Sequence, residues 1–233
     1  MSRKPSRWRL VGWLPLPGLL IAAALAAYYT PPQHLPWKPL SLDQPIGLAT
    51  HWKIAHTPPV RCRAILSAGG VDFRPARPFT EQGYCMVRDA GGIYGGLPPL
   101  YPGHPVMTCR EALALAVWQR QSLAPAARDL LGGEVTGVDQ FGTYACRDVR
   151  GGRVPAHSQH ATANAIDISG FRLGDGRRIT VEAHYHNPDS RGAFLRRVRA
   201  DACRVFSSAL GPDFNTAHHD HLHLDIGPWG TCR

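Results

Sequence analysis

The fold is decided by two segments, NAIDISG at residues 164–170 and HHDHLHLD at residues 218–225. Successive side chains of a strand point to opposite faces, so Ile166 and Ile168 share one face and Asp167 lies on the other. The same period places Leu222 and Leu224 together in the second segment. The opposite face then carries His219, His221, His223 and Asp225. Both segments are therefore predicted as strands with an aliphatic face toward the core and polar side chains toward a cleft.

Histidine and carboxylate side chains gather in and around these segments. His160 stands seven residues before Asp167, and four of the twelve histidines fall within residues 218–223. A catalytic zinc ion has three ligands of these types and a fourth position open to water. Ligands held rigidly on strands therefore predict a metal site. The alternative is an ordinary strand whose histidine-rich tract binds metal only adventitiously.

A second His-x-His pair is formed by His184 and His186. The preceding residues 174–176, Gly-Asp-Gly, are typical of a hairpin turn, and residues 188–190, Pro-Asp-Ser, are typical of a helix start. The pair is therefore predicted to lie in a loop that could face a substrate. We do not expect it to supply the primary metal ligands.

The pattern Ser-x-His, six residues, Asp, followed by His-x-His resembles a group of zinc peptidases. This group includes D-Ala-D-Ala carboxypeptidases, murein endopeptidases, lysostaphin-type enzymes and the hedgehog signalling domain. Within it, the chain most resembles the bacterial extensin-like C-terminal domain. The likeness runs from about Cys62 to Cys232 and rests on FGTYACR at 141–147, AIDISGF at 165–171 and DHLHLD at 220–225.

The resemblance implies that His160, Asp167 and His223 bind Zn²⁺. It places His221 beside the metal, as a general base or as a group that stabilises the transition state. It places Arg147 where it would polarise the scissile carbonyl or hold a substrate carboxylate. The implied activity is hydrolysis of amide bonds in peptidoglycan peptide, by an endopeptidase or a carboxypeptidase. A non-catalytic, zinc-stabilised module that binds the cell wall is the alternative.

The chain departs from the pattern of this group in two ways. It lacks the Glu-x-x-His arrangement in which some D-Ala-D-Ala dipeptidases carry their general base, so the base would be His221 or an unidentified carboxylate. Many of these peptidases have glycine where Ala163 stands, three residues after the first histidine ligand. An alanine there would be strained if the backbone required a positive φ angle.

The N-terminus indicates the compartment. Arg3, Lys4, Arg7 and Arg9 precede an uncharged stretch at residues 10–29, which is typical of a signal peptide or a signal-anchor. Residues 1–29 are therefore assigned to export, with residues 10–29 either removed or retained as an anchor in the inner membrane. Residues 30–48 are predicted as a proline-rich tether, or as a strand that wraps the domain, and residues 49–233 as one domain in the periplasm.

Six cysteines lie in this domain, and none belongs to a Cys-x-x-Cys pair. An even number of cysteines behind an export signal predicts disulfides, with fifteen pairings open. We expect Cys62–Cys85, Cys109–Cys146 and Cys203–Cys232. The formal net charge is +9, with four of the positive charges at the N-terminus. The remaining charge favours an anionic partner such as a cell-wall polymer or lipid headgroups, and nucleic acid is not expected in this compartment.

The coarse secondary structure predicts an α+β fold with a small antiparallel sheet flanked by helices, crosslinked by disulfides and, by the resemblance, similar to hedgehog and DD-peptidase domains. A capping box at residues 108–111 begins one helix, which Pro125 should interrupt or kink. A second helix is expected at residues 190–210. The expected strands are residues 137–144, 165–168, 179–183 and 219–226, and the glycine-rich residues 91–99 are expected to form a loop.

Overall fold

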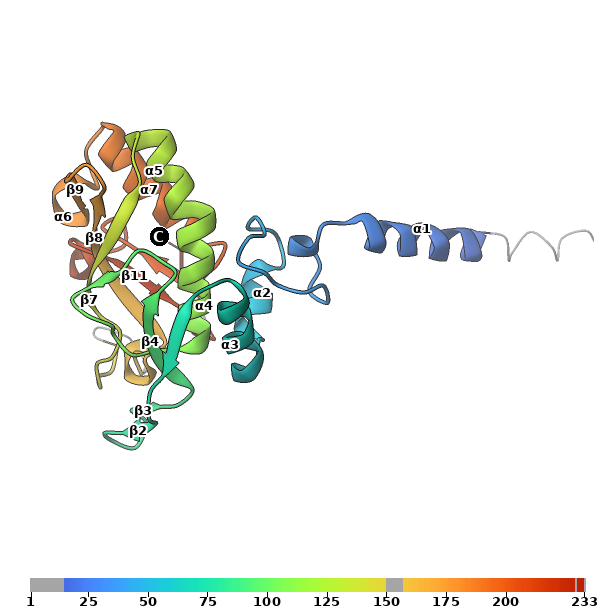
Figure 1. Ribbon diagram of the computed structural model, residues 1–233, viewed down its shortest axis with the longest axis horizontal. Helices are drawn as coiled ribbons and strands as arrows, with labels where there is room; N and C mark the ends of the chain where they lie inside the picture. Colours follow the sequence, from blue (N-terminus) through green and yellow to red (C-terminus); the bar gives the residue numbers. More distant parts are fainter. Residues whose placement is uncertain (1–14, 150–156, 229, 233) are drawn as a thin grey trace, which may run out of the picture.

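The computed structural model describes residues 15–149, 157–228 and 230–232, and it has a mixed α+β fold with several small sheets. The largest sheet has six strands in the order β10-β11-β8-β7-β5, with β9 paired to β8 (Figure 1). Its strands are β5 (Leu100–Tyr101), β7 (Val135–Gly142), β8 (Ala165–Leu173), β9 (Arg178–Thr180), β10 (Ser208–Leu210) and β11 (Leu222–Asp225). The pairing is antiparallel except between β5 and β7, so the expectation of a purely antiparallel sheet is wrong at that edge.

Two further sheets lie beside the large one. One contains β1 (Asp72–Pro75), β4 (Ala90–Gly95) and β6 (Met107–Thr108), and the other pairs β2 (Phe79–Thr80) with β3 (Met86–Val87). The glycine-rich segment expected to be a loop is therefore partly the central strand of a sheet. A Cβ atom at Gly91 would overlap the carbonyl oxygen of Arg74 on β1, so glycine permits this close pairing.

The first predicted helix continues through Pro125. The α4 helix (Cys109–Trp118) leads into a π-helical segment, η3 (Gln119–Leu123), and then into α5 (Ala124–Leu131). At this junction the Ala124 N–H donates to the carbonyl oxygen of Gln119, five residues back. The wider turn accommodates the proline, which has no N–H of its own to donate.

The second predicted helix is shorter than expected. The α7 helix (Ser190–Ala202) is capped by Asp189, whose side chain accepts from the backbone N–H groups of Arg191 and Gly192. The helix ends eight residues before Leu210. Val205 and Ala209, expected on its buried face, are indeed buried, but they lie in a turn and in β10. The chain reverses here because residues 208–210 pair with β11.

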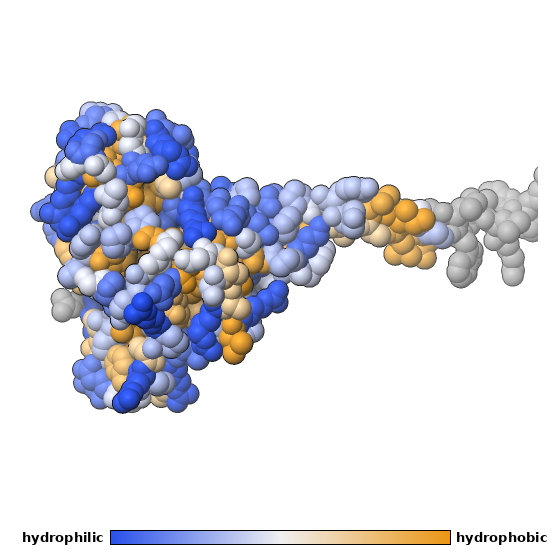
Figure 2. All heavy atoms as spheres, viewed as in Figure 1, coloured by the Kyte–Doolittle hydropathy of each residue, from blue (hydrophilic) through white to orange (hydrophobic). Residues whose placement is uncertain are grey.

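The N-terminal part reaches the domain from one side. The α1 helix (Pro15–Tyr29) projects away from the rest of the chain, and its apolar side chains are uncovered (Figures 1 and 2). No helix of the described residues has both the length and the apolar character needed to cross a membrane. The segment 30–48 contains a short helical turn, η2 (Pro32–His34), and it inserts Leu42, which is 1% exposed, into the core. It leads into α2 (Thr50–Ala55) and α3 (Pro59–Ala68).

Three disulfides crosslink the domain and indicate an extracytoplasmic location. The pairing Cys203–Cys232 is confirmed. The other two expected pairs are wrong, because the bonds are Cys62–Cys109 and Cys85–Cys146. We expected cysteines that are neighbours in the sequence to pair, whereas the packing of α3 on α4 brings the Cα atoms of Cys62 and Cys109 to 6.1 Å.

Candidate metal centre

Three side chains from separate elements converge on the face of the large sheet opposite Ile166, Ile168, Leu222 and Leu224. Asp167 on β8 and His223 on β11 are directly opposite each other in the antiparallel register. Ile166, Ile168, Leu222 and Leu224 point the other way and are fully buried, as the alternation predicted. His160 comes from a short 3₁₀ helix, η4 (Gln159–Thr162), whose preceding Ser158 hydroxyl accepts from the His160 N–H at 3.3 Å.

The helix η4 ends at Ala163, which has a φ angle of +54°. This left-handed conformation reverses the chain between the first ligand and β8. It is also the conformation in which glycine is unstrained and alanine is not. A glycine at this position would be unstrained, and this chain instead has an alanine whose side chain is fully buried.

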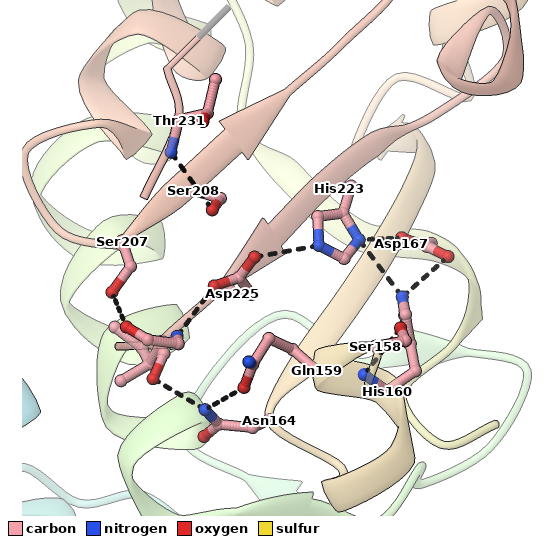
Figure 3. Close-up of polar contacts among 12 residues, drawn as sticks. Ser158, Gln159, His160, Asn164, Asp167, Ser207, Ser208, His223, Asp225 and Thr231 are labelled. Atoms are coloured by element: carbon pink, nitrogen blue, oxygen red, sulfur yellow. Dashed lines mark hydrogen bonds and ion pairs between the residues drawn. The ribbon is translucent and has the colours of Figure 1, made fainter. Parts of the chain in front are cut away.

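The donor atoms of His160, Asp167 and His223 lie within 4.8 Å of one another, so the group could bind a metal ion. His160 Nε2 is 3.2 Å from both His223 Nδ1 and Asp167 Oδ2, and His223 Nδ1 is 2.9 Å from Asp167 Oδ1 (Figure 3). Ligand atoms placed tetrahedrally around zinc at 2.0–2.1 Å stand about 3.3 Å apart. The observed triangle fits that spacing closely, and its two imidazoles and one carboxylate are a zinc-type donor set.

Each histidine of the triangle is oriented by a second partner. His160 Nδ1 lies 3.2 Å from the carbonyl oxygen of Thr143. His223 Nε2 lies 3.1 Å from Asp225 Oδ2, as Figure 3 shows. Both partners accept hydrogen bonds, so they favour the tautomers in which His160 Nε2 and His223 Nδ1 carry lone pairs toward the centre. Metal-binding histidines are typically held in this way by a carbonyl or a carboxylate.

The electrostatics of the triangle favour a cation. Burial raises the pKa of Asp167, but hydrogen bonds from His160 and His223 outweigh it and hold that pKa well below its ordinary value. Burial lowers the pKa of His223, and its hydrogen bonds to Asp167 and Asp225 outweigh this and raise it to about 9. A proton on His223 thus supplies in the metal-free chain the positive charge that a metal ion would supply.

Metal affinity is therefore expected to rise with pH up to about 9. The metal must displace the proton of His223, so the apparent affinity should increase about tenfold per pH unit between pH 7 and 9. In the metal-free chain this proton stabilises the fold below the unfolded-state pKa of about 6.5, and the stabilisation is lost as pH rises through about 9. Competition with a chromophoric chelator would measure the slope, and a flat profile over this range would contradict the expectation.

His221 lies beside the triangle and outside the group of donor atoms that it forms. Its Nε2 is 3.6 Å from Asp167 Oδ1, and its Nδ1 is bonded to Asp220 Oδ1 at 2.8 Å. Arg147 is exposed in the segment that follows β7, and its backbone carbonyl oxygen accepts from the N–H of Ser158, two residues before His160, at 3.2 Å.

His218 lies next to the triangle, with its ring centroid 5.9 Å from that of His223. His219 and the pair His184 and His186 do not contribute to the triangle. His219 precedes β11 and its side chain is 63% exposed, so it is not part of the predicted row. His184 ends a short helix, α6 (Val181–His184), where its Nδ1 accepts from the Thr180 N–H at 3.1 Å. The pair His184 and His186 is absent from the metal-type groups found among the described residues.

The sequence analysis did not predict the roles of two carboxylates near the triangle, those of Asp225 and Glu111. Asp225 was placed on the histidine face, but its role in holding His223 follows only from the distance. Glu111, read as a helix-capping residue, has a fully buried carboxyl group with no hydrogen bond among the described residues. The Ile226 N–H, which would favour the ionised carboxyl, donates to the carbonyl oxygen of Asn164 instead. Burial, with the charges of Asp225 and Asp167, raises the Glu111 pKa well above its ordinary value.

Replacing Glu111 by glutamine is expected to stabilise the domain at neutral and higher pH. Because the folded-state pKa is raised, the parent chain loses stability as pH rises above the unfolded-state value of about 4.3. The variant lacks this loss, so its melting temperature should exceed the parent's at pH 8, by about 2–4 °C for each kcal/mol gained. Melting curves at pH 4 and pH 8 would test this; an equal gain at both would refute the titration argument.

Comparison with known proteins assigns the chain to a family. No curated protein and no solved structure matches it. The family model described as Extensin-like protein C-terminus matches residues 60–233, well over half of the chain, and this range contains His160, Asp167 and His223. The chain therefore belongs to the extensin-like protein C-terminus family.

Proposed function

We propose that this protein is an exported, zinc-dependent peptidase that hydrolyses amide bonds in cell-wall peptide, as a peptidoglycan endopeptidase or carboxypeptidase. The observation that carries the proposal is the triangle of His160, Asp167 and His223, with both histidines oriented from behind. A purely structural strand pair does not need three polar groups that turn lone pairs toward one point. We also propose that the domain is related to DD-peptidase and hedgehog domains.

In this proposal His160, Asp167 and His223 hold the zinc ion. Bound zinc acts as a Lewis acid that makes water nucleophilic near neutral pH and polarises a carbonyl group. The chain supplies the remaining functions. Asp220 accepts from His221 Nδ1 and so leaves Nε2, on the side of Asp167, as the basic atom that takes and returns the proton. Arg147 offers an exposed guanidinium to a substrate carboxylate or to the developing negative charge.

The compartment supports a cell-wall substrate. Three disulfides indicate that the domain works outside the cytoplasm, where peptidoglycan is accessible. We propose that the location is the periplasm and that residues 10–29 attach the chain to the inner membrane. Residues 10–14 lie outside the described part of this segment. No nucleic acid partner is proposed.

The first experiment combines metal content with activity. The full chain, produced in an oxidising compartment without a histidine tag, is analysed for zinc and incubated with purified peptidoglycan before and after chelation. One zinc ion per chain and chelator-sensitive release of peptide fragments would support the peptidase. Zinc without cleavage would favour the alternative of a zinc-stabilised binding module. A folded chain without zinc would refute the proposal.

A further inference from the structure

A second polar site lies at the end of the domain from which α1 projects. Residues 36–40, α2 and α3 enclose a cavity of about 210 Å³. Its lining contains the cations Lys38, Lys53 and Arg61 and no aspartate or glutamate. This volume is below that of a site for a drug-sized ligand, and it suits a small headgroup.

The cations of this cavity are close together and are not neutralised. Burial lowers the pKa of Lys53, and the neighbouring charges of Arg61 and Lys38 lower it further. The ammonium groups of Lys38 and Lys53 donate to backbone carbonyls, while Arg61 is exposed. The one carboxylate in residues 30–70, Asp43, is paired with Arg120 at 3.2 Å. The cavity therefore favours an anionic ligand.

Aromatic and aliphatic side chains surround these cations. Trp37 and Trp52 line the cavity and are 68% and 48% exposed. Val60, at the start of α3, is 73% exposed. Tryptophan next to lysine and arginine is the composition of a protein surface that rests in the headgroup region of a bilayer.

The cavity is joined to the apolar helix α1. Lys38 Nζ donates to the carbonyl oxygens of Tyr28 at 2.8 Å and of Thr30 at 2.6 Å, so the cavity wall holds the C-terminal end of that helix. The leucine and isoleucine side chains of α1 are at least 51% exposed, and the helix ends in Tyr28 and Tyr29 (Figure 2). A membrane that takes up α1 would bring its headgroups to the cavity.

We propose that the face formed by residues 36–40, α2 and α3 docks on an anionic phospholipid bilayer, with a lipid phosphate group in the cavity. The inference rests on the proposed membrane attachment of the N-terminal segment and is independent of the zinc centre. Docking would fix the height and orientation of the domain, with the metal centre on other elements of the fold left free.

Hydrogen–deuterium exchange of the full chain in lipid nanodiscs tests the proposal. Discs of phosphatidylcholine alone are compared with discs that contain phosphatidylglycerol, and exchange is followed in α2–α3 and, as a reference, in α5. We expect slower exchange in α2–α3 only in the anionic discs. Arg61→Gln should reduce that protection about fivefold, since a cation near an anionic bilayer contributes about 1 kcal/mol. Arg61→Lys should keep the protection, and Arg128→Gln, which removes an exposed charge from α5, should not change it.

Three results would overturn the proposal. Equal protection in both kinds of disc would exclude recognition of lipid charge. Protection in neutral discs on addition of glycerol 1-phosphate, matching that in anionic discs, would assign the cavity to a soluble phosphate compound. A chain that fails to enter discs at all would show that the membrane attachment itself is wrong, and zinc content and peptidoglycan cleavage would be unaffected by that result.

Discussion

Asp167→Ala is expected to yield a folded domain that no longer retains metal. The substitution removes one of the three proposed ligands and the carboxylate that contacts the other two, since Asp167 lies 2.9 Å from His223 Nδ1 and 3.2 Å from His160 Nε2. It also removes a charge that raises the pKa of His223. Metal affinity should fall by more than the 10–100-fold typical of losing a group that only orients a ligand. Equilibrium dialysis with zinc, with circular dichroism to check the fold, measures the effect.

Two matched variants define what this loss means. Asp225→Asn changes the group that holds His223 from behind, so it should weaken zinc binding only about 10–100-fold. Asp139→Ala removes a buried aspartate of the adjacent strand β7, which pairs with Arg172 and Arg178, and should lower stability without releasing zinc. If all three variants lost metal equally, the loss would reflect damage to the sheet, and the assignment of Asp167 as a ligand would fail.

His221→Ala is expected to keep zinc and lose turnover. His221 faces the triangle from 3.6 Å but is not one of its three donors, so metal content should stay at one ion per chain. A general acid–base residue contributes about 10²–10⁴-fold to rate, and peptide release from peptidoglycan should fall by that factor. Zinc analysis and timed digestion of the same preparation measure both quantities.

The neighbouring His219 provides the control for this variant. Its side chain is 63% exposed, and His219→Ala should leave zinc content and digestion near the parent values. Release of zinc by His221→Ala would show that the division of roles between His221 and His223 is wrong. Unchanged turnover with zinc retained would remove His221 from the proposed mechanism.

The sequence predicted the centre of the site better than its surroundings. Alternation over residues 165–168 and 222–225 specified which side chains face the core, because a two-residue period leaves no other choice once the aliphatic side is placed there. It did not predict that Ala165 and Asp225, on the opposite face, are buried too. The end of α7 was not predictable in this way, since Val205 and Ala209 continue the helical spacing and only pairing with β11 turns the chain into a strand. The Cys62–Cys109 bond depends on how α3 packs against α4, which local sequence does not encode. Glu111 looked like a capping residue, and only the tertiary contacts reveal that its carboxyl group is buried.

The disulfide bond between Cys85 and Cys146 makes metal affinity depend on whether the chain has been oxidised. It joins the segment next to β3 to the residue beside Arg147, three residues after the carbonyl that orients His160. Before this bond forms, the segment after β7 has no crosslink at Cys146 to the segment next to β3. Fixing the position of Thr143 and His160 then carries a larger entropic cost. A newly made chain in a reducing cytoplasm would therefore capture metal poorly and acquire its full affinity only after export. Oxidation would in this way act as a maturation step that restricts metal binding to chains outside the cytoplasm.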